Sequence, residues 1–106
     1  MTEALVVLCT FPNEGEARQI GTHLVERQYA ACVNILSSVK SIYFWEGKVC
    51  QEQEVMAMIK TTRQAFPVLG RELAAMHSYD EPEIIALPVA DGSAGYLAWL
   101  ESRSRA

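Results

Sequence analysis

The sequence lacks a long apolar run, an excess of basic residues and any sign of paired cysteines. None of its apolar runs approaches the roughly 20 residues that a membrane span requires. The net charge is −4, with acidic and basic residues scattered along the 106 positions. Because phosphate backbones are bound through clustered basic side chains, we expect neither nucleic acid nor a membrane as a partner.

Targeting and catalytic signatures are also missing. The first residues, MTEALVVLCTF, have no basic flank and no small-residue cleavage site, so we predict no signal peptide. The three cysteines, Cys9, Cys32 and Cys50, are an odd number, which favours reduced thiols in the cytoplasm over a disulfide framework. The sequence contains no GxSxG, no phosphate-binding glycine loop and no HExxH, and we therefore expect no enzyme.

What the sequence does contain is typical of one globular domain covering residues 1–106, with 50% apolar and 21% charged residues. Ala4 to Phe11 is a short apolar run rich in valine, as in a strand buried on both faces. Asn13 is in a position to cap the next helix, with Glu16 at the capping-box position. Ser37 and Ser38 interrupt a second apolar run as a predicted bend or bulge.

Further along the chain, the apolar period changes to two on both sides of Gly47, which predicts a long hairpin. Thr62 is the expected cap of a second helix, with Pro67 in its first turn. The predicted elements are a strand at 4–11, a helix at 13–28, a strand at 30–36 that continues past Ser37 and Ser38 into the first half of a hairpin at 39–61, a helix at 62–76, a strand at 84–89 and a short helix at 96–102.

This order predicts an α+β fold of the ferredoxin-like class, a four-stranded antiparallel sheet with helices on one face. The first strand should lie between the third and fourth strands. The other sheet face is left without helices, and either Met56 and Met58 or Val55 and Ile59 must lie on it. An uncovered apolar face of this kind indicates an oligomer.

Several motifs, in order along nearly the whole chain, resemble the CutA divalent-cation-tolerance family: ACVNI, YFWEGK, QEQEV, IKTT, HSYDEPEI, LPV and YLAWL. The resemblance implies a cytoplasmic ferredoxin-like homotrimer, similar in architecture to the PII signalling proteins, with a role in tolerance of divalent metal ions, copper above all. It also implies that the hairpin reaches neighbouring subunits. The aromatic residues Tyr43, Phe44 and Trp45 at its tip would then be interface anchors.

The resemblance also implies copper ligands, a cysteine in the LCT strand and a pair of histidines. Cys9 matches the cysteine and His77 the second histidine, whereas Met76 replaces the first histidine and Ser78 replaces the usual proline. The predicted layout brings the end of the first strand close to the end of the second helix, so Cys9, His77 and Met76 are the predicted metal ligands. Such soft donors suit weakly bound copper, in particular Cu(I), and we expect no other cofactor.

Each of these residues also has a purely structural interpretation. A lone cysteine in an apolar strand, such as Cys9, is usually a small core residue, and His77 is also typical of a residue that complements a helix C-terminus. Asp80, Glu81 and Glu83 form either a hard-cation site or a solvated acidic loop. Our hypothesis is a non-enzymatic trimer that binds divalent metal weakly. The alternative is a PII-like signalling or scaffold trimer that binds a small molecule or a protein partner in clefts between subunits.

Overall fold

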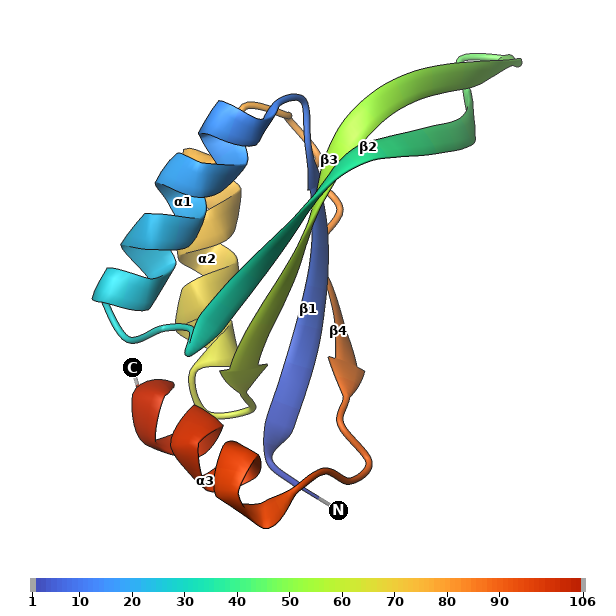
Figure 1. Cartoon of the computed structure of the whole chain (residues 1–106). Helices are drawn as coiled ribbons and strands as arrows, with labels where there is room; N and C mark the ends of the chain where they lie inside the picture. The colour runs from blue at the N-terminus through green and yellow to red at the C-terminus, as the bar shows by residue number, and fades with distance from the viewer. Residues whose placement is uncertain (1, 106) are drawn as a thin grey trace.

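The computed structural model describes residues 2–105 as one sheet with three helices (Figure 1). The elements are β1 (Ala4–Phe11), α1 (Glu14–Glu26), β2 (Cys32–Trp45), β3 (Lys48–Thr62), α2 (Phe66–Met76), β4 (Ile85–Pro88) and α3 (Ala94–Arg103). The predicted α+β order is confirmed. In the part of the chain that the structure describes, no helix has the length and apolar character needed to cross a membrane.

The sheet has the strand order β2-β3-β1-β4 with antiparallel neighbours throughout. The first strand therefore lies between the third and fourth strands, as predicted. Helices α1 and α2 cover one face of the sheet, and α3 lies at the end of the sheet opposite the hairpin tip (Figure 1). The strands β2 and β4 are the two edges.

The core lies between the sheet and helices α1 and α2. Alternate residues of β1 and β3 are buried there, among them Cys9 and Ile59, which are both 0% exposed. This settles the question of which face β3 turns outward. Val55 and Ile59 lie beneath the helices, so the half-buried Met56 and Met58 lie on the uncovered face, because successive strand residues point to opposite faces.

Helix α1 starts as predicted but ends early. The side chain of Asn13 accepts a hydrogen bond from the Glu16 backbone N–H at 2.8 Å, so Asn13 is the N-cap. The helix ends at Glu26, two residues before the predicted end, because Gln28 adopts a left-handed backbone with φ of 62°. Such a residue cannot continue a right-handed helix.

Helix α2 begins four residues later than Thr62, the predicted cap. Thr62 is instead the last residue of β3. Its hydroxyl accepts a hydrogen bond from the Ala65 backbone N–H at 3.2 Å and donates one to the Ser104 carbonyl at 2.8 Å. The helix itself starts at Phe66, with Pro67 in its first turn as predicted. Thr62 thus stabilises the turn before α2 and also binds Ser104, the residue that follows α3.

The β2–β3 hairpin extends beyond the rest of the sheet (Figure 1). We call residues 39–54 the arm. The pairing of β2 with β3 shifts between Leu36 and Val39, and Ser38 has φ of 62°, so the predicted bulge lies at the base of the arm. At the tip, Glu46 and Gly47 have φ of 49° and 80°, the left-handed pair that a tight hairpin turn requires.

Candidate functional site

A large hollow lies between the arm and the loop that follows α2, and we call it the acidic cleft. Its volume is about 830 Å³, which is within the range of small-molecule sites. Its lining comprises aromatic, hydroxyl and carboxylate side chains: Thr10, Ser41, Ile42, Tyr43, Trp45, Glu52, Glu54, Ser78, Tyr79, Asp80, Glu81 and Glu83.

Five carboxylates line this cleft. Asp80, Glu81 and Glu83 come from the loop that the sequence had already marked as acidic, whereas Glu52 and Glu54 come from β3. The sequence pattern alone does not connect the two groups, because the whole of α2 separates them along the chain. The sequence feature that could have indicated part of the cleft is the alternation of side chains along β3, which places Glu52 and Glu54 on the same face of the strand.

Two tyrosines hold two of these carboxylates in place. The Tyr43 hydroxyl donates to Glu52 Oε1 at 2.6 Å, and the Tyr79 hydroxyl donates to Glu54 Oε2 at 2.7 Å. The hydrogen bond to Glu52 raises the pKa of Tyr43 to about 12. Burial, together with the hydrogen bond to Glu54, raises the pKa of Tyr79 well above the ordinary tyrosine value. Both hydroxyls therefore remain protonated donors at neutral pH.

The loop that bears Tyr79 is anchored to α1. The backbone N–H of Glu16 donates to the side chain of Asn13, the helix cap. Its carboxylate oxygen Oε2 accepts a hydrogen bond from the backbone N–H of Ser78 at 2.9 Å. The same oxygen lies 3.6 Å from Nδ1 of His77. One acidic side chain of the first helix thus fixes the start of the loop that forms one wall of the cleft.

His77 is a buried structural residue in this conformation. Its Nε2–H donates to the Thr10 carbonyl at 2.8 Å, and its Nδ1 accepts from the Tyr79 backbone N–H at 3.0 Å. Because one ring nitrogen donates and the other accepts, the imidazole is the neutral Nε2–H tautomer. The ring also stacks on Phe11, with centroids 4.6 Å apart and planes 13° apart. Both nitrogens are therefore engaged within the chain.

Cys9 lies in the core next to this histidine. Its sulfur lies 3.8 Å from the carbonyl oxygen of Thr10, the same oxygen that His77 contacts, so the predicted convergence of the two side chains is present. Burial raises the pKa of the thiol to about 12, helped by the negative charges of Glu83, Glu16 and Glu54. The thiol is thus protonated at neutral pH, whereas metal ions bind the thiolate.

Met76 is the last residue of α2 and is 37% exposed, unlike its buried neighbour His77. Within residues 2–105, no group of three or more histidine, cysteine or acidic side chains is arranged to hold a metal ion. The structure therefore brings Cys9 and His77 together but does not arrange the three predicted ligands as a ready site. Metal binding by Cys9, His77 and Met76 stays a prediction.

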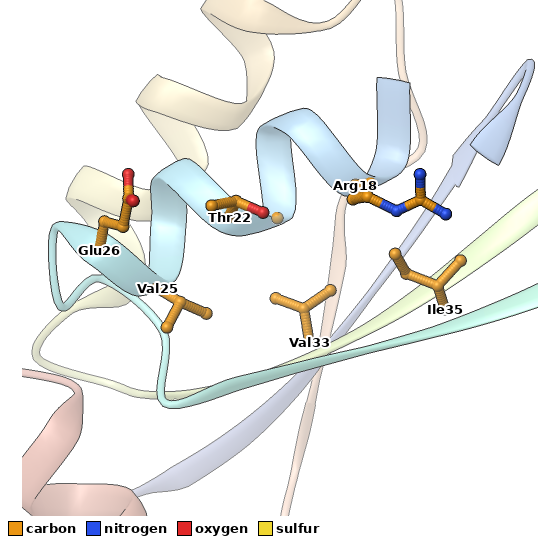
Figure 2. Close-up of a pocket in the computed structure, with 7 residues that line it drawn as sticks. Arg18, Thr22, Val25, Glu26, Val33 and Ile35 are labelled. Atoms are coloured by element: carbon orange, nitrogen blue, oxygen red, sulfur yellow. The ribbon is translucent and has the colours of Figure 1, made fainter. Parts of the chain in front are cut away.

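A second, smaller hollow of about 260 Å³ lies between α1 and the edge strand β2 (Figure 2). Val25, Val33 and Ile35 form its apolar walls. Figure 2 shows Arg18 at the Ile35 end and Glu26 at the Val25 end. At its floor the helix approaches the strand closely, because a Cβ on Gly21 would lie 3.2 Å from Val33 Cγ1. Nothing in this hollow resembles a catalytic or metal-binding arrangement.

Residues 5–103 match the CutA1 divalent ion tolerance protein family. Among relatives, the divalent-cation tolerance protein CutA of Thermus thermophilus is 48% identical over 99 residues, which are 93% of this chain and 96% of that protein.

Solved structures agree with this match. The divalent cation tolerance protein of Thermus thermophilus superposes with a TM-score of 0.93 at 48% identity, covering 95% of this chain and 98% of that chain. The periplasmic divalent cation tolerance protein CutA of Archaeoglobus fulgidus superposes with a TM-score of 0.92 at 35% identity, covering 96% and 99%.

Proposed function

This chain belongs to the CutA1 divalent ion tolerance family, and from that premise we propose that it acts in copper tolerance as a cytoplasmic homotrimer that binds the metal weakly. The role requires no catalysed reaction, and we propose that the protein is not an enzyme. The observation that carries the proposal best is the common end of β1 and α2, where the Cys9 thiol and the His77 imidazole meet at one carbonyl oxygen.

We expect weak metal binding because the thiol of Cys9 is protonated and both nitrogens of His77 already form hydrogen bonds. A metal ion must displace the proton of a buried thiol whose pKa is about 12 and must compete with the two hydrogen bonds of His77. The half-exposed Met76 thioether adds a soft donor for Cu(I). Binding should therefore strengthen as pH rises, since fewer protons compete for the thiol and the imidazole.

Copper titration of matched cysteine variants tests this site. We expect calorimetry with Cu(I) under anaerobic conditions to show binding that Cys9→Ser abolishes and that Cys50→Ser leaves intact. Cys32→Ser serves as a second control, because Cys32 and Cys50 lie outside the core. Equal binding by all three variants would overturn the assignment of Cys9.

The trimer is supported by apolar surface that the single chain leaves uncovered. On the face of the sheet away from the helices, Leu36, Ile85 and Leu87 are 44%, 50% and 47% exposed. The two sheet edges, β2 and β4, are different from one another, and contacts between two different surfaces form a ring when the rotation from one subunit to the next closes. Sedimentation equilibrium at micromolar concentration tests the trimer, and a stable monomer would refute it.

The cytoplasmic location is supported by the three cysteines, which are all free. Free thiols persist in reducing compartments. Cell fractionation tests this part of the proposal separately, since the Archaeoglobus relative is described as periplasmic.

The acidic cleft favours a second candidate function, a PII-like trimer that responds to a small molecule. The supporting observation is a hollow of about 830 Å³ next to the arm, the part of the chain expected to contact neighbouring subunits. Screening small molecules against the trimer tests this function independently of copper.

A further inference from the structure

The two ring nitrogens of His77 have different neighbours. Nε2 donates to the Thr10 carbonyl oxygen at 2.8 Å, and the Cys9 sulfur lies 3.8 Å from the same oxygen. Nδ1 lies 3.6 Å from Oε2 of Glu16, which belongs to α1. Nε2 is therefore the nitrogen on the Cys9 side, and it is the one that a copper ion held by Cys9 would occupy.

Copper binding at Nε2 requires a change of tautomer. Nε2 carries the ring proton in this structure, whereas a metal ion needs the lone pair of that nitrogen. If the ring stays neutral, the proton that Nε2 releases to solvent is replaced by one that Nδ1 takes up. Nδ1 then no longer accepts the Tyr79 backbone N–H. Because the His77 side chain is 0% exposed, the new Nδ1–H needs an acceptor within the protein.

Glu16 is placed to be that acceptor. Its carboxylate is held in position by the Ser78 backbone N–H at 2.9 Å. The 3.6 Å between Oε2 and Nδ1 is longer than a hydrogen bond, as expected while Nδ1 carries no proton. Histidines that bind metal ions almost always donate their other N–H to a carboxylate, a backbone carbonyl or water, and this partner fixes the tautomer and the orientation of the ring.

The charge of Glu16 has a second effect, on Cys9. After burial and the charge of Glu83, it is a further cause of the raised pKa of the Cys9 thiol. A thiolate that holds Cu(I) has no net charge together with the ion, so this repulsion is largely cancelled once the metal is bound. The hydrogen bond to His77 is then the effect that remains.

We propose that Glu16 is a positioning residue for copper, whose carboxylate accepts the Nδ1–H of His77 and so keeps Nε2 free for the ion beside Cys9. This inference rests on the proposed copper function and adds the residue that selects the tautomer of the ligand. Glu16 acts through His77 and does not itself bind the ion.

Nitrogen-15 NMR of the histidine rings tests the tautomer in the unchanged protein. Cu(I) is diamagnetic, and the chain has only two histidines. We expect the proton of His77 on Nε2 before Cu(I) is added and on Nδ1 afterwards, under anaerobic conditions and at mildly alkaline pH. His23, which bonds to Glu72, is the internal reference and should not change.

Copper titration of matched carboxylate variants tests the role of Glu16 separately. Glu16→Gln keeps an oxygen for the Ser78 N–H but removes the charge, so the loop stays anchored while the bond to Nδ1 weakens. We expect the Cu(I) affinity to fall about tenfold or more, the usual effect of changing such a partner. Glu14→Gln removes the same charge from the first turn of α1, where Glu14 pairs with Arg18, and should leave the affinity unchanged.

The outcomes separate this proposal from the copper function. Copper held by Cys9 while Nε2 of His77 keeps its proton would overturn the role of Glu16 and leave the copper function standing. Absence of Cu(I) binding would overturn both. An unchanged affinity of Glu16→Gln, or equal weakening by Glu14→Gln, would also overturn the proposal, since the second result would show an effect of net charge alone.

Discussion

Replacing Trp45 with alanine should dissociate the proposed trimer. Trp45 is 60% exposed at the tip of the arm. A tryptophan side chain offers about 250 Å², so roughly 150 Å² of it remains for a neighbouring subunit. At about 25 cal/mol per Å², burying this area contributes at most about 4 kcal/mol. Truncated interface anchors commonly cost about 2 kcal/mol or more, which weakens each contact roughly 30-fold.

Sedimentation velocity over a dilution series measures this loss. We expect the variant to dissociate at concentrations at which the unchanged protein is still a trimer. Trp99→Ala is the matched control, because Trp99 is 42% exposed and lies in α3, away from the arm. If Trp45→Ala and the unchanged protein dissociate over the same range, the arm is not an interface anchor and the reasoning from its exposed aromatic residues is wrong.

Three further predictions concern the single chain. At neutral pH an alkylating reagent should modify Cys32 and Cys50 but not Cys9. The thiol of Cys9 is fully buried and has a pKa of about 12, and both properties protect it until the protein unfolds. Mass spectrometry of the alkylated protein, with and without denaturant, measures this difference. His77→Ala should lower the free energy of unfolding by about 3 kcal/mol, because it removes a buried ring that stacks on Phe11 and makes two hydrogen bonds. Urea titration measures this loss, and a change below about 1 kcal/mol would contradict the prediction. The raised pKa of Tyr79 means that the folded state holds its proton more tightly than the unfolded state, so stability should fall as pH rises above about 10; in Tyr79→Phe, thermal melts should lose part of that alkaline slope.

The order of the elements could be predicted from the sequence, since it depends on local periods and turn residues. The alternation along β3 and the turn at Gly47 are examples, and the structure confirms both. Element ends were less predictable. Helix α1 stops at Glu26 because Gln28 takes a left-handed backbone, and the start of α2 depends on Thr62, whose hydroxyl also binds the Ser104 carbonyl. Such ends depend on contacts that a sequence pattern does not contain.

The acidic cleft could not be predicted, because its walls are brought together in three dimensions. Glu54 faces the loop that bears Tyr79 only because both the arm and that loop lie at the end of the sheet where β1 finishes. The hydrogen bond from the Ser78 backbone N–H to the Glu16 carboxylate could also not be predicted from the sequence. The capping-box pattern predicts that Glu16 turns back to its own helix, whereas its carboxylate binds the loop instead. The meeting of Cys9 and His77 was predictable, because it follows from topology alone.

The place of β1 in the middle of the sheet has a consequence for synthesis on the ribosome. β1 leaves the ribosome before β3 and β4, the two strands with which it pairs. Residues 12–47 separate β1 from β3, and at about 5–20 residues per second these 36 residues take about 2–7 seconds to make. During that time the most apolar strand of the domain has no sheet to join. The β2–β3 hairpin, whose contacts are local, can form first and offer β3 as the template onto which β1 folds.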